Sequence, residues 1–281
     1  MQDFSYTAAD SSFLLSLEKQ RAPHQMVVNH WHDSYEIYYL LSGERCYFIK
    51  NQTYRLTRGS LVLIQPQELH RTLAAAGVGC WERILINFRP DFLIAAHPER
   101  IAWLSELFRR PYRLLQFSLK EQTAAEEILM QMLHEASQQE TGFLEMLAAH
   151  LVRLLLLAVR QKPSGPEAPD SRDTWQNNRA APIVSYLNEH YPEALSLAGL
   201  AQRFHLSDGY LCKIFRAATG FTVIEYLNQV RIREAQNLLR QTPDSVLEIA
   251  GRVGFGNVSH FGRIFKEITG TPPVSYRKRY R

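Results

Sequence analysis

The chain has 281 residues, enough for about two domains that each bury a hydrophobic core. Hydrophobic residues make up 46% and charged residues 21% of the sequence, which is typical of a globular protein and argues against disorder. The longest aliphatic run, residues 154–159, is far shorter than the roughly 20 residues that a membrane span needs. The N-terminus lacks the features of a signal peptide, and Cys46, Cys80 and Cys212 form no CxxC pair. We therefore expect a cytoplasmic protein.

The net charge of +4 is unevenly distributed along the chain. Residues 178–281 carry a formal charge of +6, whereas residues 1–177 carry −2. A basic C-terminal third beside a mildly acidic remainder suggests a module that binds a polyanion, joined to a domain with another role.

Residues 25 to about 88 show the pattern of β-strands. Short β-branched and aromatic runs alternate with turn signals such as Ser42-Gly43-Glu44, at intervals of about 8–12 residues that are typical of a sandwich or a barrel. In an extended segment, alternate side chains share one face, which places His30, His32, Glu36 and Tyr38 together. We expect this β-domain to occupy residues 1–115.

Helical patterns follow after Pro90. Residues 91–108 form one candidate helix, and Ser118 and Glu121 form a capping box that starts another, extending to about Gln138. A leucine-rich helix at about 142–161 follows. These helices exceed what a small β-domain needs as cover, so residues 116–162 are predicted to pair two subunits; packing within the domain is the alternative. The predicted dimer contacts are Leu144, Leu147, Leu151 and Leu154.

Residues 163–178 have the composition of a linker, with 3 prolines, 1 glycine and many polar residues. A helical domain is expected over residues 179–281.

The last hundred residues contain an internal repeat with a period of about 50 residues. The matched positions are Ile214, Phe215, Thr219, Gly220 and Tyr226 in the first copy, and Ile264, Phe265, Thr269, Gly270 and Tyr276 in the second. Each copy predicts a short helix, a tight turn and a second helix, which begins after Ser207 in one copy and after Asn257 in the other. Gly220 and Gly270 stand where a left-handed residue would end each second helix. Thr222 opens a long helix, to about Gln241, between the copies.

Two helix–turn–helix units in tandem on a basic domain predict double-stranded DNA as a partner, because such a unit lays its second helix in the major groove. Arg and Lys on that helix can each donate two hydrogen bonds to guanine. Leu211 and Phe215 are expected to form the buried face in the first unit, and Phe261 and Phe265 in the second. The predicted DNA-contacting residues are Ser207, Asp208, Gly209, Cys212, Lys213, Arg216, Asn257, Ser259, Arg263 and Lys266.

These stretches resemble the AraC family of bacterial transcription regulators. Residues 249–277 match the family signature over almost their whole length, and residues 200–220 resemble it in the first copy. The resemblance implies that both recognition helices enter adjacent major grooves and that RNA polymerase is a partner. Gly209 and Cys212 stand where longer polar side chains are common, which predicts weaker base readout by the first unit. By family position, the base-facing residues are Gly209, Cys212, Lys213, Asn257, Ser259 and Arg263.

The N-terminal domain resembles the cupin pattern. His30-x-His32-x3-Glu36-x6-Gly43 fits the first cupin motif, and the segment from Gly59 to His70 fits the second motif loosely. The resemblance implies a small β-barrel that binds a small molecule in its mouth, as in sugar-responsive members of the AraC family.

Three interpretations of this site remain open. In the first, the site binds a polar effector, a sugar or a sugar acid, and Arg45 or Arg83 would pair with an acidic one. The predicted ligand contacts are His30, His32, Glu36, Tyr38, Arg45, His70, Trp81 and Arg83. In the second, the imidazoles and carboxylate of His30, His32, Glu36 and His70 hold a divalent metal. In the third, the histidines are polar rim residues exposed to solvent.

Together the patterns predict an α+β protein of two domains: a cupin-like β-barrel with trailing helices, then an all-α domain with two helix–turn–helix units. The predicted function is a ligand-responsive, sequence-specific transcription regulator, an activator of carbohydrate uptake or catabolism genes that acts as a homodimer. A metal-dependent or stress-responsive regulator of the same architecture is the alternative. A cupin enzyme fused to a DNA-binding domain is a further alternative, but the sequence contains no GxSxG, P-loop, GxGxxG or HExxH motif. We therefore expect no catalytic residues and no obligatory cofactor.

Overall fold

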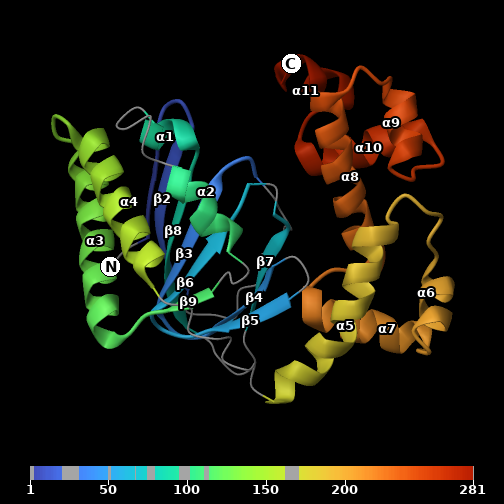
Figure 1. The fold of residues 1–281 in the computed structure, drawn as a ribbon, viewed down its shortest axis with the longest axis horizontal. Helices are drawn as coiled ribbons and strands as arrows, with labels where there is room; N and C mark the ends of the chain where they lie inside the picture. The colour runs from blue at the N-terminus through green and yellow to red at the C-terminus, as the bar shows by residue number, and fades with distance from the viewer. Residues whose placement is uncertain are drawn as a thin grey trace. The chain divides into compact units, whose positions relative to one another are not determined.

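The computed structural model describes residues 3–20, 32–49, 52–66, 68–74, 80–94, 102–110, 114–161 and 171–280 (Figure 1). The chain divides at residue 170 into two compact units, and each has buried hydrophobic residues of its own. Within the described ranges, no helix is both long and apolar enough to cross a membrane. The two-domain α+β architecture predicted from the sequence is confirmed.

The first unit contains two β-sheets. The larger sheet has six strands in the order β1-β2-β8-β3-β6-β9, and the smaller has three in the order β5-β4-β7. The strands of the larger sheet are β1 (Phe4–Thr7), β2 (Phe13–Gln20), β8 (Trp81–Phe88), β3 (Tyr35–Ser42), β6 (Ser60–Ile64) and β9 (Leu114–Gln116). Those of the smaller sheet are β5 (Gln52–Leu56), β4 (Arg45–Ile49) and β7 (His70–Ala74). Neighbouring strands of the larger sheet run antiparallel, as do β4 and β7.

The central strands β3 and β6 of the larger sheet bury side chains on both faces. On β3, Ile37 and Tyr39 join a core shared with the helices, whereas Tyr38 and Leu40 point to the opposite face. There they pack with Tyr47 and other side chains of the smaller sheet. We call the space between the two sheets the inter-sheet interior; its apolar lining residues are Tyr38, Leu40, Tyr47, Ile49, Leu56, Val62, Ile64 and Trp81.

The sequence analysis did not predict the two N-terminal strands, β1 and β2, because it expected strands only from residue 25. β2 pairs with β8 along its whole length, from Phe13 opposite Phe88 to Gln20 opposite Trp81. Its sequence has few β-branched residues, which lowers its apparent strand propensity. Buried and more exposed side chains nevertheless alternate along β2, and that period of two was the available signal.

The described part of the first unit also contains the helices α1 (Pro90–Ile94), α2 (Ala102–Arg109), α3 (Leu119–Gln138) and α4 (Phe143–Arg160). The single helix predicted over 91–108 corresponds to α1 and α2, and residues 95–101 lie outside the described ranges. The capping box at the start of α3 is confirmed. Ser118 Oγ accepts from the Glu121 amide, and Glu121 Oε2 accepts from the Ser118 amide over 2.9 Å.

The leucines of α4 were predicted to pair two subunits, and for three of them this was wrong. Leu147, Leu151 and Leu154 are each 0% exposed and belong to the core that α3 and α4 share with the larger sheet. Of the four predicted contacts only Leu144 is exposed, at 39%. A stripe of apolar side chains at helical spacing shows that one face is buried, but not against what. Here α1, α2 and α3 of the same chain pack against α4, and its leucines belong to the core that these helices share with the larger sheet.

The second unit is helical in all its described parts. Its helices are α5 (Ser171–His190), α6 (Leu197–Arg203), α7 (Asp208–Thr219), α8 (Val223–Gln241), α9 (Val246–Arg252), α10 (Val258–Thr269) and α11 (Pro273–Tyr280). The linker predicted over 163–178 is therefore too long at its C-terminal end, because α5 begins at Ser171. The polar residues that follow Pro169 do not break a helix, and α5 is anchored further along by buried Ile183, Val184 and Leu187.

Candidate nucleic-acid interface and ligand site

The second unit contains two helix–turn–helix units of the same construction. The first joins α6 to α7 and the second joins α9 to α10, with the long helix α8 between them (Figure 1). Equivalent hydrogen bonds close both turns: the Leu206 amide donates to Ala201 O, and the Phe255 amide to Ala250 O, each over 2.9 Å. Gly220 and Gly270 end α7 and α10 with φ of 76° and 75°, so the predicted left-handed caps are confirmed.

Both second helices have one buried and one exposed face, as predicted. Leu211 and Phe215 on α7, and Phe261 and Phe265 on α10, are each 0% exposed. The ten predicted DNA-contacting residues, Ser207, Asp208, Gly209, Cys212, Lys213, Arg216, Asn257, Ser259, Arg263 and Lys266, are all exposed. Solvent-accessible cations along these helices fit the phosphates and base edges of a major groove.

Ser207 and Asn257 also have a structural task, because their side chains cap the recognition helices. Ser207 Oγ accepts from the Tyr210 amide over 3.3 Å. Asn257 Oδ1 accepts from the amides of Ser259 and His260, over 2.8 and 3.0 Å. His260 is a candidate that the sequence analysis missed: it is exposed and lies three residues before Arg263 on α10. Its match to Tyr210 across the repeat was the available signal.

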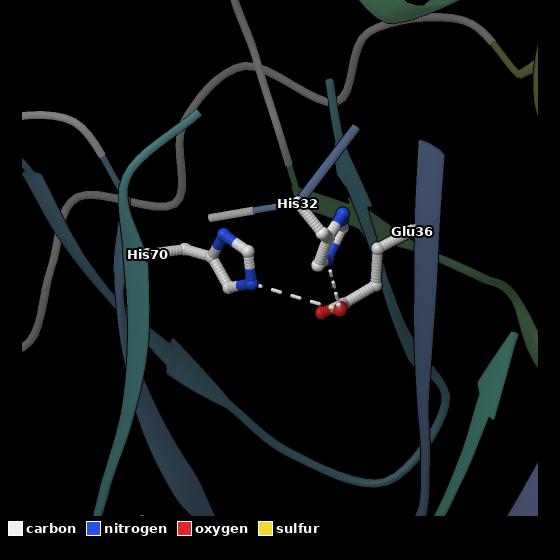
Figure 2. Close-up of side chains that lie close together, drawn as sticks. All are labelled: His32, Glu36 and His70. Carbon is white, nitrogen blue, oxygen red and sulfur yellow. Dashed lines mark hydrogen bonds and ion pairs between the residues drawn. The ribbon is translucent and has the colours of Figure 1, made fainter. Parts of the chain in front are cut away.

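In the first unit, the inter-sheet interior holds a buried carboxylate between two imidazoles. Glu36 on β3 is 1% exposed, and His70 at the start of β7 is 0% exposed. Glu36 Oε2 lies 2.9 Å from His32 Nε2 and 3.6 Å from His70 Nε2. Figure 2 shows the three side chains directed toward one another from different parts of the chain. One ligand atom from each of the three lies within 4.8 Å of the others, which is close enough for a single ion to contact all three.

Two further groups hold the carboxylate of Glu36. The Tyr47 hydroxyl donates to Glu36 Oε1 over 2.5 Å. In the amide orientation that satisfies both neighbours, Asn87 donates to Glu36 Oε2 over 3.2 Å. Glu36 is thus surrounded by donors, as a buried carboxylate must be if it is to stay ionised.

The electrostatics of this cluster favour an ion pair. Burial alone would raise the pKa of Glu36, but the charge of His70 and hydrogen bonds from His32 and His70 hold that pKa well below its usual range. Burial would likewise lower the pKa of His70, but the charge of Glu36 and its hydrogen bond raise it. Burial also raises the pKa of the Tyr47 hydroxyl, reinforced by the charge of Glu36, so Tyr47 stays a donor.

Backbone carbonyls orient both imidazoles. His32 Nδ1 lies 2.8 Å from Ser34 O, and His70 Nδ1 lies 2.7 Å from Glu68 O. A carbonyl can only accept, so each Nδ1 carries a proton and each Nε2 faces Glu36. An Nε2 in that position is either protonated, giving an imidazolium paired with the carboxylate, or free to bind a metal.

Toward the other end of β3 and β8, aromatic and cationic side chains share the same interior. Tyr38 is 0% exposed, Arg45 2% and Trp81 4%. The guanidinium carbon of Arg45 lies 4.5 Å from the centre of the Trp81 ring. Arg83 forms an ion pair with Glu18 over 2.5 Å.

Seven of the eight predicted ligand contacts therefore converge on the inter-sheet interior, whereas His30 lies outside the described residues. The interpretation of the histidines as exposed rim residues is wrong for His70, which is fully buried. The sequence analysis did not find Tyr47 and Asn87, because their place beside Glu36 depends on pairing with distant strands. Along the second half of β8, buried and half-buried residues alternate, and this period of two is the local hint that marks Asn87 as a strand residue.

A sheet domain with a buried polar site, followed by tandem helix–turn–helix units with exposed cations, defines a two-domain DNA-binding regulator. Residues 13–155 match the AraC-like ligand binding domain, and residues 200–279 match a helix-turn-helix domain family. The chain belongs to the AraC family of ligand-responsive transcription regulators.

Relatives similar to this chain span nearly its whole length. The uncharacterised regulator YfiF of Bacillus subtilis is 25% identical over 97% of this chain and 85% of its own. The Msm operon regulatory protein of Streptococcus mutans is 29% identical over 88% of this chain and 84% of its own. The transcriptional activator RhaS of Klebsiella pneumoniae is 27% identical over 92% of this chain and 90% of its own.

Proposed function

We propose that this protein is an activator of carbohydrate uptake or catabolism genes in the bacterial cytoplasm, switched by a small polar effector that binds in the inter-sheet interior. The observation that carries the proposal is the placement of half-buried His32 and of buried Glu36, His70 and Arg45 in the inter-sheet interior, which the rings of Tyr38 and Trp81 help to line. Hydrogen-bonding groups around aromatic faces suit a ligand with hydroxyl groups and one apolar side. The names of two relatives, the transcriptional activators RhaR and RhaS, support the activator role.

The proposal extends to a homodimer that contacts RNA polymerase. Because Leu147, Leu151 and Leu154 are buried, we place the proposed dimer surface on the exposed side of α3 and α4 instead. A cavity of about 380 Å³ there is lined by Met130, Gln131, His134, Glu135, Met146 and His150. Apolar Met130 and Met146 lie there beside hydrogen-bonding side chains such as Gln131 and Glu135. Such a mixed patch can complement itself about a twofold axis, which favours a second copy as its occupant.

The test combines effector binding with DNA binding in the full-length protein. Neutral sugars, sugar acids and short oligosaccharides are screened by thermal shift in EDTA, and operator DNA is selected from a random library. At 100 times its dissociation constant, an effector should add about 2.7 kcal/mol to the free energy of unfolding. A hit must also change DNA affinity or transcription in vitro, because an effector acts only through different affinity for two states. Failure of every sugar and sugar acid would contradict the carbohydrate role.

A second candidate is a metal-dependent regulator, favoured by the orientation of the two histidines. Nδ1–H donated to a backbone carbonyl, with Nε2 turned inward, is the arrangement that supports metal-bound imidazoles. His32, Glu36 and His70 would hold the ion, and a bound divalent cation would supply fixed positive charge to orient an effector.

Equilibrium dialysis of the full-length protein against Zn²⁺, Mn²⁺, Ni²⁺ and Fe²⁺ tests this candidate. We expect one ion per chain, lost in His70→Ala but retained in His134→Ala, which removes an exposed imidazole on α3. If both variants retain the metal equally, or if the parent protein binds no metal, the metal-dependent candidate is contradicted. The site would then bind an organic effector without a metal.

A further inference from the structure

The two helix–turn–helix units are connected by α8, which runs between them (Figure 1). This helix of 19 residues packs against α5 and α7 beside the first unit, and against α9, α10 and α11 beside the second. Long helices bend along their length. α8 by itself would therefore leave the two recognition helices some freedom of relative orientation.

Arg231, in the middle of α8, ties this helix to the segment that precedes the first helix–turn–helix unit. Its Nε donates to Tyr191 O over 2.8 Å, and its Nη2 donates to Glu193 O over 2.7 Å. Both carbonyls belong to the short connection between α5 and α6. Because a guanidinium group is planar and rigid, two bonds from it fix both the position and the direction of this connection against α8.

The same connection lies against the turn of the second helix–turn–helix unit. A Cβ placed on Gly254 would lie only 2.7 Å from Pro192 O. The guanidinium carbon of Arg231 lies 5.6 Å from the centre of the buried Phe255 ring in that turn. Arg231 therefore contacts both halves of the domain. We call residues 191–193, Arg231, Gly254 and Phe255 the Arg231 joint.

The surroundings of Arg231 suit a contact within the protein better than a contact with DNA. Its side chain is half-buried, and burial lowers the pKa of its guanidinium. Two of its three nitrogen atoms already donate to backbone carbonyls. The exposed arginines of the recognition helices have no such commitment to the backbone of the first half.

We propose that the Arg231 joint fixes the relative orientation of the two recognition helices and thereby sets the spacing of the two half-sites that one chain recognises. Recognition helices that enter successive major grooves require half-sites about one helical turn apart. One inserted base pair moves the second half-site by about 3.4 Å along the DNA and rotates it by about 34°. A fixed joint cannot follow this change, whereas α8 alone can bend toward it. Arg231 is thus a positioning residue for operator recognition.

The test measures how the full-length protein tolerates a changed spacing. Operator DNA is selected from a random library, and Lys213→Ala and Arg263→Ala identify the half-site that each recognition helix reads. The spacing penalty is the affinity for this operator divided by the affinity for the same operator with one base pair inserted between the half-sites. We expect a penalty of about tenfold or more in the parent protein.

Three substitutions locate the origin of the penalty. Arg231→Met should reduce it to about threefold or less and weaken binding to the selected operator, because the recognition helices are no longer preorganised. Arg231→Lys, which restores a cation that can donate to a carbonyl, should recover part of the penalty. Arg233→Met is the matched control, since Arg233 lies on the same helix and pairs with the neighbouring Glu234, and should keep the penalty of the parent.

Two results would overturn the proposal. A parent protein that binds both spacings equally has no fixed orientation to explain. Equal losses of affinity for both spacings in Arg231→Met would make Arg231 a phosphate contact or a residue that matters for stability alone. If Arg231→Met does not fold, Gly254→Ala decides, because its added Cβ presses on Pro192 from the other side of the joint. That variant should lower the penalty or shift the preferred spacing, and an unchanged spacing preference contradicts the joint.

Discussion

His205 and Gly254 occupy the same left-handed position in the turns of the two helix–turn–helix units, with φ of 54° and 92°. The turns share their closing hydrogen bond, yet only one uses glycine. The reason lies in the surroundings. A Cβ at Gly254 would lie 2.7 Å from Pro192 O and 2.9 Å from Tyr191 O, whereas the His205 side chain is exposed. Close backbone approach, in addition to φ, requires the glycine.

Gly254→Ala should therefore destabilise the second unit by about 1–3 kcal/mol, through backbone strain and the clash with Pro192. Gly251→Ala is the matched control, because Gly251 lies in α9 and nothing lies within 4 Å of its added Cβ. We expect that control to be neutral or to stabilise by up to about 1 kcal/mol. Urea unfolding measures both, and equal effects would contradict the role of the close approach.

Arg263 should read a base from the exposed face of α10. Arg263→Ala is expected to cost about 1–3 kcal/mol in DNA affinity and to relax the preference at one base position. Lys120→Ala, which removes an exposed cation from α3, is the control. Binding to a library of single-base operator variants measures both effects. A uniform loss across all operators would make Arg263 a phosphate contact instead.

The corrected dimer surface predicts opposite outcomes for two α4 residues. Met146 is 45% exposed and lines the cavity on α3 and α4, so Met146→Asp should shift sedimentation toward the monomer and leave stability nearly unchanged. Leu151 is 0% exposed, so Leu151→Ala should lower the free energy of unfolding by about 2–5 kcal/mol and leave the dimer intact. A dimer that survives Met146→Asp would place the interface elsewhere.

The Glu36–His70 pair predicts how the stability of the first unit depends on pH. Because the pKa of Glu36 is lowered in the folded protein, its carboxylate contributes fully to the free energy of unfolding above about pH 4.3, the usual pKa of a glutamate. That contribution is lost as the pH falls through the lower pKa of the folded state. Because the pKa of His70 is raised in the folded protein, its imidazolium contributes fully to the free energy of unfolding below about pH 6.5, the usual pKa of a histidine. That contribution is lost as the pH rises through the higher pKa of the folded state. The pair therefore stabilises most between these limits.

Urea unfolding in EDTA, from pH 5.5 upward, checks the alkaline side of this prediction. The free energy of unfolding should fall as pH rises in the parent protein, and the slope should flatten in His70→Gln. His134→Gln, which changes an exposed histidine of the same unit, should keep the slope of the parent. The same slope in all three proteins would show that His70 does not carry a pH-dependent charge in the folded state.

Much of the second unit was predictable because its signals are local. The capping boxes at Thr222 and Ser245, and the left-handed glycines at 220 and 270, involve residues within four positions of one another. The exposed recognition faces follow from the helical period alone. The linker was overextended because polar composition was taken to exclude helix, although α5 is stabilised from its buried C-terminal half.

By itself, the sequence determined the two-domain order, the tandem helix–turn–helix units and the residue types available to an effector site. The cupin resemblance already grouped His32, Glu36 and His70 in one site, and the structure brings them together. Only the tertiary structure decided that Tyr47 and Asn87 join them. It also decided that the α4 leucines are buried in the core of their own domain. These outcomes depend on pairing between segments far apart in the chain, and a local pattern specifies which face is buried but not what buries it.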